Sequence, residues 1–209
     1  MTKKELALKA VEALKETYPD ALCSLNAKNP LELLIATRLS AQCTDARVNI
    51  VTPALFEKYK TLDDYCVADV KDVENIIRSC GFYHEKAKDI IGIAQKIKSD
   101  FNGEVPDTIE KLTSLPGVGR KTANLIMGDV FKAPSSVVTD THLIRIANRI
   151  GLVSTKDPKK VEFELRAILP ADESSDFCHR TVLHGRAVCT SRKAHCEKCS
   201  LDNFCKKKI

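Results

Sequence analysis

Hydrophobic positions recur along this chain with the period of α-helices from one end to the other. Thr2 and Glu5 have the spacing of a capping box, and the apolar residues that follow fall on one helix face. After Asn29 and Pro30, the run LELLIATRLSA from Leu31 is apolar on most sides, which predicts a central, buried helix. The chain contains neither a sustained strand-like alternation nor an internal repeat. The pattern therefore predicts an all-α protein.

Start and stop signals divide the rest of the chain into further helices. Capping residues and prolines mark their beginnings, and glycines mark several of their ends. Pro53 is expected to begin a helix of its own, and Asp107 with Glu110 to open a short one. The predicted ranges are 45–52, 53–60, 69–80, 85–101, 107–115, 120–131, 141–150, 158–169 and 174–188.

Composition places the protein among ordinary globular chains. With 209 residues, 44% of them hydrophobic and 29% charged, it can form two small domains, and we expect the chain to cross between them near residues 132–136. Aromatic residues make up 5% and Trp is absent, which argues against a thick β-sandwich. The N-terminus lacks the apolar core of a signal peptide, and no run approaches membrane-span length. We expect a cytoplasmic protein, nucleoid-associated in a prokaryote, without a membrane partner.

Four cysteines near the C-terminus have the spacing C-x6-C-x2-C-x5-C: Cys189, Cys196, Cys199 and Cys205. Thiolates this close in sequence can converge on one inorganic centre. Structural zinc usually takes two short knuckles, and only Cys196 and Cys199 are spaced as one, so a [4Fe-4S] cluster is favoured. Zinc and paired disulfides or free thiols stay open as alternatives. The other five cysteines lie in apolar segments and are interpreted as buried and reduced.

Positive charge is concentrated around these cysteines. Residues 189–209 hold six basic and two acidic residues, so nearly all of the formal net charge of +5 lies there. Arg192 and Lys193 fall between two of the expected ligands, where their side chains are partly ordered in advance and lose less entropy on binding a phosphate. The alternative is a solvated basic segment.

A second informative segment is LPGVGRKTA, which starts at Leu115 and joins two predicted helices. Gly117 and Gly119 allow positive φ angles and a close backbone approach, which would aim the next helix's N–H groups at an anion. The alternative is an ordinary corner between helices. Arg120 and Lys121 favour a functional site, because each cation in a first helical turn opposes the helix dipole at a cost of up to about 1 kcal/mol.

Lys121 and Asp140 are candidates for catalysis. The positive end of the helix dipole favours a neutral Lys121 amine, which is a nucleophile, although nearby phosphates would oppose this. Asp140 precedes a predicted helix as its N-cap, and eighteen residues between the two are enough to bring them into one cleft. Its carboxylate could stabilise a positive sugar-like transition state, or it is a cap alone. His142 is interpreted as a packing or hydrogen-bonding residue.

These segments resemble those of a known family. LPGVGRKTAN followed by VVTDTHLIRIANRIG is similar to the helix-hairpin-helix and Gly/Pro-Asp motif of the DNA glycosylases, and the cysteine spacing resembles the cluster loop of their endonuclease III family. LLIATRLSAQCTDARVN and CGFYHEKA resemble two further stretches, so the likeness covers nearly the whole chain. It implies an all-α, two-domain glycosylase fold with a C-terminal iron–sulfur loop. Residues 22–133 would form a six-helix domain, and 1–21 with 134–209 the cluster domain.

The resemblance also implies a reaction and a partner. Lys121 would attack C1′ of a damaged nucleotide, with Asp140 as the catalytic carboxylate, and the opened sugar would undergo β-elimination. Substrates would be oxidised pyrimidines or abasic sites in double-stranded DNA, bound by a monomer. Gln42 would enter the gap left by the flipped base, and Phe82 would wedge into the duplex. The expected DNA contacts are Gln42, Phe82, Gly117, Gly119, Arg120, Arg192 and Lys193.

Three positions depart from the family pattern. Phe82 stands where Leu is frequent, His84 replaces a polar amide, and Thr139 replaces the usual Val before Asp140. The changes at positions 82 and 84 bear on opposite-base preference, whereas Thr139 adds a hydroxyl group near the Asp140 carboxylate. Other superfamily glycosylases, for mismatched or alkylated bases, are the nearest alternative, although adenine-mismatch enzymes lack the hairpin lysine. A non-catalytic iron–sulfur DNA-binding module and a zinc-bound structural protein are the others.

Overall fold

The computed structural model describes residues 1–207 and divides the chain into two compact units. Ser24–Val130 forms one unit, and Met1–Cys23 forms the other together with the chain from Phe131 onward. These divisions fall within three residues of the predicted domain boundaries. In the described part of the chain, the structure contains helices and a single isolated antiparallel bridge, between Cys189 and Ala194, but no strand. The all-α prediction is therefore confirmed.

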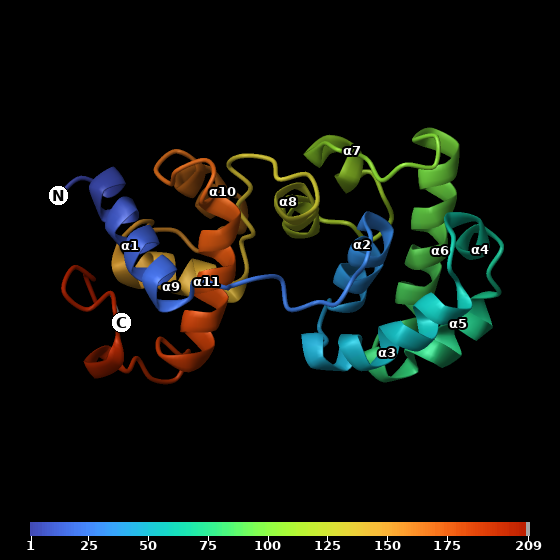
Figure 1. Ribbon diagram of the computed structural model, residues 1–209, viewed down its shortest axis with the longest axis horizontal. Coiled ribbons are helices and arrows are strands. Elements are labelled where there is room, and N and C mark those ends of the chain that lie inside the picture. Colours follow the sequence, from blue (N-terminus) through green and yellow to red (C-terminus); the bar gives the residue numbers. More distant parts are fainter. Residues whose placement is uncertain (208–209) are drawn as a thin grey trace. The chain divides into compact units, whose positions relative to one another are not determined.

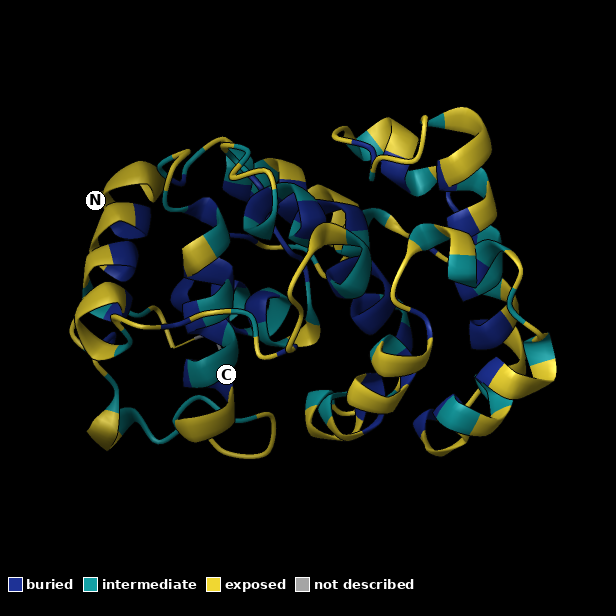
Figure 2. Ribbon diagram, turned by 45° about the vertical axis from the view of Figure 1, so that its right-hand side comes forward, coloured by how far each residue is buried: buried dark blue, intermediate teal, exposed yellow. Residues whose placement is uncertain are grey.

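Within the described residues, the discontinuous unit contains four α-helices and a short 3-10 helix, and Figure 1 labels its α-helices. Helix α11 packs against both α1 and α9. The apolar stripe of α1 is buried, as Figure 2 shows in dark blue, and its capping box is formed as predicted. The elements are α1 (Lys3–Thr17), α9 (Thr141–Ile150), α10 (Pro158–Arg166), α11 (Ser174–Ala187) and η2 (Cys196–Lys198).

The continuous unit contains seven α-helices and one 3-10 helix. Helix α2 is buried along most of its length, as its apolar sequence predicts, and α6 packs against α2, α4 and α5. The elements are α2 (Pro30–Leu39), α3 (Asp45–Lys58), α4 (Leu62–Cys66), α5 (Val70–Ile77), η1 (Arg78–Cys80), α6 (Tyr83–Asp100), α7 (Ile109–Thr113) and α8 (Arg120–Asp129).

Three details of this unit differ from the sequence prediction. Pro53 lies inside α3 instead of beginning a helix, since burial of Val48, Val51 and Leu55 along one continuous face outweighs the lost hydrogen bond. Helix α4 was not predicted because its five residues are too few to show a period. The N-cap of α7 is Thr108, whose hydroxyl accepts from the Lys111 N–H, so the predicted opening at Asp107 is wrong. The family resemblance implied six helices in this unit, and the structure has seven α-helices, α4 among them.

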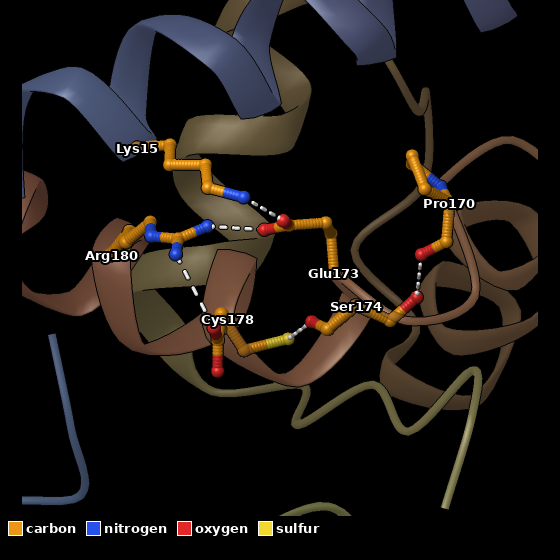
Figure 3. A network of polar contacts seen from close by, with 7 residues as sticks. Lys15, Pro170, Glu173, Ser174, Cys178 and Arg180 are labelled. Atoms are coloured by element: carbon orange, nitrogen blue, oxygen red, sulfur yellow. Dashed lines mark hydrogen bonds and ion pairs between the residues drawn. The ribbon is translucent and has the colours of Figure 1, made fainter. Parts of the chain in front are cut away.

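A network of polar contacts joins α1 to the start of α11 (Figure 3). The Glu173 carboxylate accepts hydrogen bonds from Lys15 of α1 and from Arg180 of α11, the latter at 2.6 Å. Arg180 is buried and also pairs with Asp176 at 3.3 Å. The hydrogen bonds from Lys15 and Arg180 lower the pKa of Glu173. This carboxylate therefore links two helices of the unit that also carries the four C-terminal cysteines.

Candidate functional site

The glycine turn before α8 is held against a charged pair. Gly117 has a φ of 66°, and a Cβ atom there would lie 2.3 Å from both Arg38 Nε and Asp89 Oδ2. Arg38 donates to Asp89 Oδ2 through Nε at 2.6 Å, and both side chains are largely buried. Only glycine fits this position, because both the backbone angle and the close approach exclude a side chain. Arg38 of α2 and Asp89 of α6 thus pack directly against the turn at Gly117.

Gly119 differs from the prediction made for it. Its φ of −92° is accessible to any residue, and a Cβ atom there would meet nothing within 4 Å. It is the N-cap of α8 and supplies no side chain to the helix's first N–H groups. Because no side chain caps these donors and a Cβ atom at Gly119 would meet nothing within 4 Å, Gly119 leaves them accessible to an anion. The structure therefore explains Gly117 by its own packing, whereas neither the backbone angle nor the packing requires glycine at position 119.

Arg120 and Lys121 form the first turn of α8. Lys121 is exposed, and Arg120 is partly buried. No acidic residue lies in this first turn, so the two cations oppose the helix dipole as the sequence indicated. The exposed Lys121 amine therefore belongs to the same helical turn as N–H groups that no side chain caps.

Asp140 is the N-cap of α9. Its Oδ1 accepts a hydrogen bond from the Leu143 N–H at 2.7 Å, and its side chain is partly exposed. One oxygen is therefore occupied by the helix end. The preceding Thr139 is buried. Asp140 and Lys121 belong to different units, so their cooperation in one site remains part of the proposed function.

His142 is held by neighbouring residues of its own unit. Its Nδ1 lies 3.1 Å from Arg145 Nη2, and a Cβ atom at Gly185 of α11 would lie 2.5 Å from the same nitrogen. Burial lowers the pKa of this imidazole, which Asp140 opposes. These contacts agree with the packing and hydrogen-bonding role inferred from the sequence.

Gln42 and Phe82 occupy strained positions in two loops of the continuous unit. Gln42 has a φ of 53° and Phe82 a φ of 48°, values uncommon for residues other than glycine. Both residues are exposed, and Phe82, a large apolar residue, has a relative solvent accessibility of 65%. Such strain persists only where the surrounding structure imposes it, and it frequently marks functional sites. His84 is exposed and pairs with Glu74 at 2.8 Å.

The four C-terminal cysteines line one cavity. Cys189, Cys196, Cys199 and Cys205 all contribute to its wall, together with Arg149 and other residues of the same unit. Burial raises the pKa of the Cys199 and Cys205 thiols. Within residues 1–207, no three or more His, Cys, Asp or Glu side chains are grouped so that they could hold a single metal ion. The four cysteines nevertheless surround one cavity, and a set of four sulfur donors has the chemistry that an iron–sulfur cluster requires.

Hydrogen bonds from neighbouring residues reach three of these sulfur atoms. Arg149 Nη1 donates to Cys189 Sγ at 3.2 Å and to the Thr190 carbonyl at 2.7 Å. The Lys207 N–H donates to Cys205 Sγ at 3.4 Å. His184 Nε2 lies 3.4 Å from Cys199 Sγ. The donors from Arg149 and Lys207 stabilise thiolates and orient them for a bound centre, whereas the direction of the contact between His184 and Cys199 depends on the imidazole tautomer.

Arg192 and Lys193 lie in a closed turn between the first two cysteines. The bridge between Cys189 and Ala194 closes the turn, and the Thr190 hydroxyl accepts from the Lys193 N–H at 3.0 Å and donates to its carbonyl at 2.7 Å. Both basic side chains are exposed. The backbone that carries these charges is therefore ordered by local hydrogen bonds.

Three supporting residues were not found from the sequence: Arg149, His184 and Lys86. Arg149 and His184 contact cysteines far away in the sequence, and no local pattern reports such contacts. Lys86 did carry a signal, because it shares the apolar stripe of α6 with Ile90, Ile93 and Ile97. A lysine at a core position of a helix indicates a buried amine with specific partners.

Comparison with known proteins places this arrangement in a class. The model of the HhH-GPD superfamily base excision DNA repair proteins matches residues 35–171, which include the glycine turn, Lys121 and Asp140. The chain is 44% identical to endonuclease III of Synechocystis sp. over 98% of this chain and 93% of the relative. It is 39% identical to endonuclease III of Bacillus subtilis over 94% and 90%.

Solved structures give the same result. A trapped covalent endonuclease III–DNA intermediate, in an estranged-adenine complex, aligns with a TM-score of 0.91 at 40% identity, covering 99% of this chain and 97% of that one. A non-covalent endonuclease III–DNA complex aligns with the same TM-score and identity over 99% and 96%. A thermostable thymine-DNA glycosylase, at 22% identity and a TM-score of 0.86, shares the fold. The chain therefore belongs to the endonuclease III family of the HhH-GPD superfamily.

Proposed function

We propose that this protein is a bifunctional DNA glycosylase and abasic-site lyase of base excision repair, acting on oxidised pyrimidines in double-stranded DNA. The observation that carries the proposal is the exposed Lys121, which lies in the first turn of α8 behind a glycine turn that leaves the helix N-terminus open. A relative trapped on DNA as a covalent intermediate supports it, because a covalent step needs a nucleophile of this kind.

Two kinds of group bind the DNA in this proposal: some contact its phosphate backbone, and others insert among its bases. The N–H groups at the start of α8, with Arg120, bind phosphate near the lesion. Phe82 wedges between base pairs, and Gln42 fills the gap when the damaged nucleotide leaves the stack. Flipping is easiest for a base that already stacks poorly, which gives part of the selectivity for ring-damaged pyrimidines.

The chemical step replaces the bond from sugar to base with a bond from sugar to lysine. The neutral amine of Lys121 attacks C1′, and the base leaves with the electron pair of the glycosidic bond and then gains a proton. The sugar ring opens to a Schiff base. Loss of a proton from C2′ then breaks the C3′–O bond and nicks the strand 3′ to the lesion, and water releases Lys121. Asp140 stabilises positive charge on the sugar in the transition state.

The four cysteines hold a [4Fe-4S] cluster in this proposal. The donor set, the shared cavity and the N–H groups that donate to two of the sulfur atoms support that assignment. The cluster would supply a rigid anchor for the C-terminal loop. Arg192 and Lys193 project from the ordered turn between Cys189 and Cys196 and bind the DNA backbone. Iron and sulfide analysis of the purified protein, with its visible absorption, distinguishes the cluster from zinc.

A cleavage assay tests the proposed function. A duplex with one thymine glycol should lose the base and be cut 3′ to it, leaving an unsaturated sugar on one end and a phosphate on the other. The same duplex with an intact thymine is the matched control. Base loss without a nick would limit the protein to glycosylase activity, and the absence of both would contradict the proposal.

A further inference from the structure

Lys86 is a buried lysine of α6 that the proposed reaction does not use. None of its surface is accessible, and its Nζ donates to the backbone carbonyls of Leu39 and Cys80, each at 2.8 Å. Burial lowers the pKa of its amine. Lysine is rarely kept without accessible surface, because removing the ammonium group from water is costly. Because burying this amine is costly, we expect its two hydrogen bonds to have a specific role.

Each of these two carbonyl groups lies shortly before a residue with a positive φ angle. Leu39 is the last residue of α2, three positions before Gln42, and Cys80 ends η1, two positions before Phe82. Carbonyl groups at helix ends lack partners within their own helix. Lys86 therefore satisfies one such group in each element and joins the two backbones through a single nitrogen atom.

The backbone of Lys86 also contacts the Phe82 loop on the side that follows Phe82 in the chain. Its backbone N–H donates to the Phe82 carbonyl at 3.1 Å, in the first turn of α6. Phe82 is the N-cap of that helix and makes no side-chain capping bond. The positive φ angles of Gln42 and Phe82 must be held by surrounding contacts, and the Lys86 amine supplies one contact three positions before Gln42 and one two positions before Phe82.

We propose that Lys86 is a positioning residue for base flipping, which holds the loops of Gln42 and Phe82 at the spacing needed to enter the duplex together. The inference rests on the proposed function, since it takes the insertion roles of these two residues from there. Lys86 is not itself a second nucleophile, because no part of it reaches the surface. Its effect on the reaction passes through the two loops.

The test compares Lys86→Met with Lys88→Met. Methionine retains most of the side-chain volume but donates no hydrogen bond. Lys88 lies two residues further along α6, is exposed, and pairs only with Glu85 at 3.8 Å, so it is the matched control. Each protein is assayed at saturating enzyme on a thymine glycol duplex and on single-stranded DNA with an abasic site. The single strand has neither a base to flip nor a gap to fill.

Lys86→Met should slow base excision from the duplex by about tenfold or more, because a small misplacement of positioning groups has effects of this size. Cleavage of the single strand should stay within about twofold of wild type, and Lys88→Met should match wild type on both substrates. Equal losses on both substrates would assign Lys86 to fold stability alone and overturn the proposal. Unchanged activity on both would also overturn it. Inactivity of the wild-type protein on both would instead refute the proposed function.

A second measurement tests whether Lys86 acts through the two loops. In a Gln42→Ala/Phe82→Ala protein, Lys86→Met should change duplex excision by less than about twofold, because its targets are already absent. An undiminished loss in that background would overturn the proposal. If melting curves show that Lys86→Met does not fold, Lys86→Leu, which also donates no hydrogen bond, takes its place in both comparisons.

Discussion

Asp140 caps α9 through a 2.7 Å hydrogen bond from the Leu143 N–H to its Oδ1. The same carboxylate is proposed to act on the DNA sugar, so its structural and chemical roles must be separated. The bond engages one oxygen, and the charge of the group is what the transition state requires. A change that keeps the cap and removes the charge is therefore the informative one.

Asp140→Asn should retain the fold and lose activity. Asn is as good an N-cap as Asp, whereas loss of a charge used in the transition state slows turnover by about 100-fold or more. Asp140→Ala is the comparison, because it also removes the cap and should lower the free energy of unfolding by about 1 kcal/mol. Single-turnover excision and urea unfolding measure the two effects. Near-normal excision by folded Asp140→Asn would leave Asp140 as a cap only.

Gly117 and Gly119 should respond differently to substitution. Gly117→Ala forces a side chain into a positive-φ position against Arg38 and Asp89, so we expect a loss of about 2 kcal/mol or more in stability. Gly119→Ser should be stable, because its backbone is extended and serine is a good N-cap. It should nevertheless weaken binding to abasic duplex, since the new side chain occupies the space before the N–H groups. Wild-type affinity in Gly119→Ser would remove Gly119 from the DNA interface.

Neutralising Arg192 and Lys193 should weaken binding to damaged and undamaged duplex alike, because phosphates carry no sequence information. The slope of log K against log salt should decrease by about 0.9 for each phosphate that the variant no longer neutralises. Lys4→Gln/Lys9→Gln removes the same charge from exposed positions of α1 and is the matched control. Binding isotherms at several salt concentrations measure both effects. Visible absorption must show that the variants and the wild-type protein have the same cluster content. A slope unchanged from wild type would mean that this turn does not bind DNA.

Glu173 should contribute to stability in a pH-dependent way. Hydrogen bonds from Lys15 and Arg180 lower its pKa from the ordinary value of 4.5, so its contribution is fully present above that pH and is lost as pH falls through the folded-state value. Glu173→Gln should destabilise the protein by about 3 kcal/mol at neutral pH, because buried Arg180 loses a partner. The difference from wild type should shrink below pH 4.5 in urea unfolding. A difference independent of pH would exclude the ionised pair as its cause.

The sequence predicted the helices with strong periods and clear caps, including α1, α2 and α9. It failed where tertiary packing overrode a local rule, as at Pro53, and where an element was too short to show a period, as in α4. Gly117 was predicted for the right reason, but Gly119 was not, because its backbone angle depends on the cap geometry of α8. Lys86 illustrates the remaining limit, since its partners lie 47 and 6 residues away.

Borohydride trapping on a thymine glycol duplex tests the central role of Lys121 most directly. Reduction of the Schiff base should give a stable protein–DNA adduct with wild-type protein and with Lys111→Ala, which removes an exposed lysine of α7. Lys121→Ala should form none, while it still binds abasic duplex. An adduct that forms undiminished in Lys121→Ala would contradict the account, because another amine would then attack the sugar.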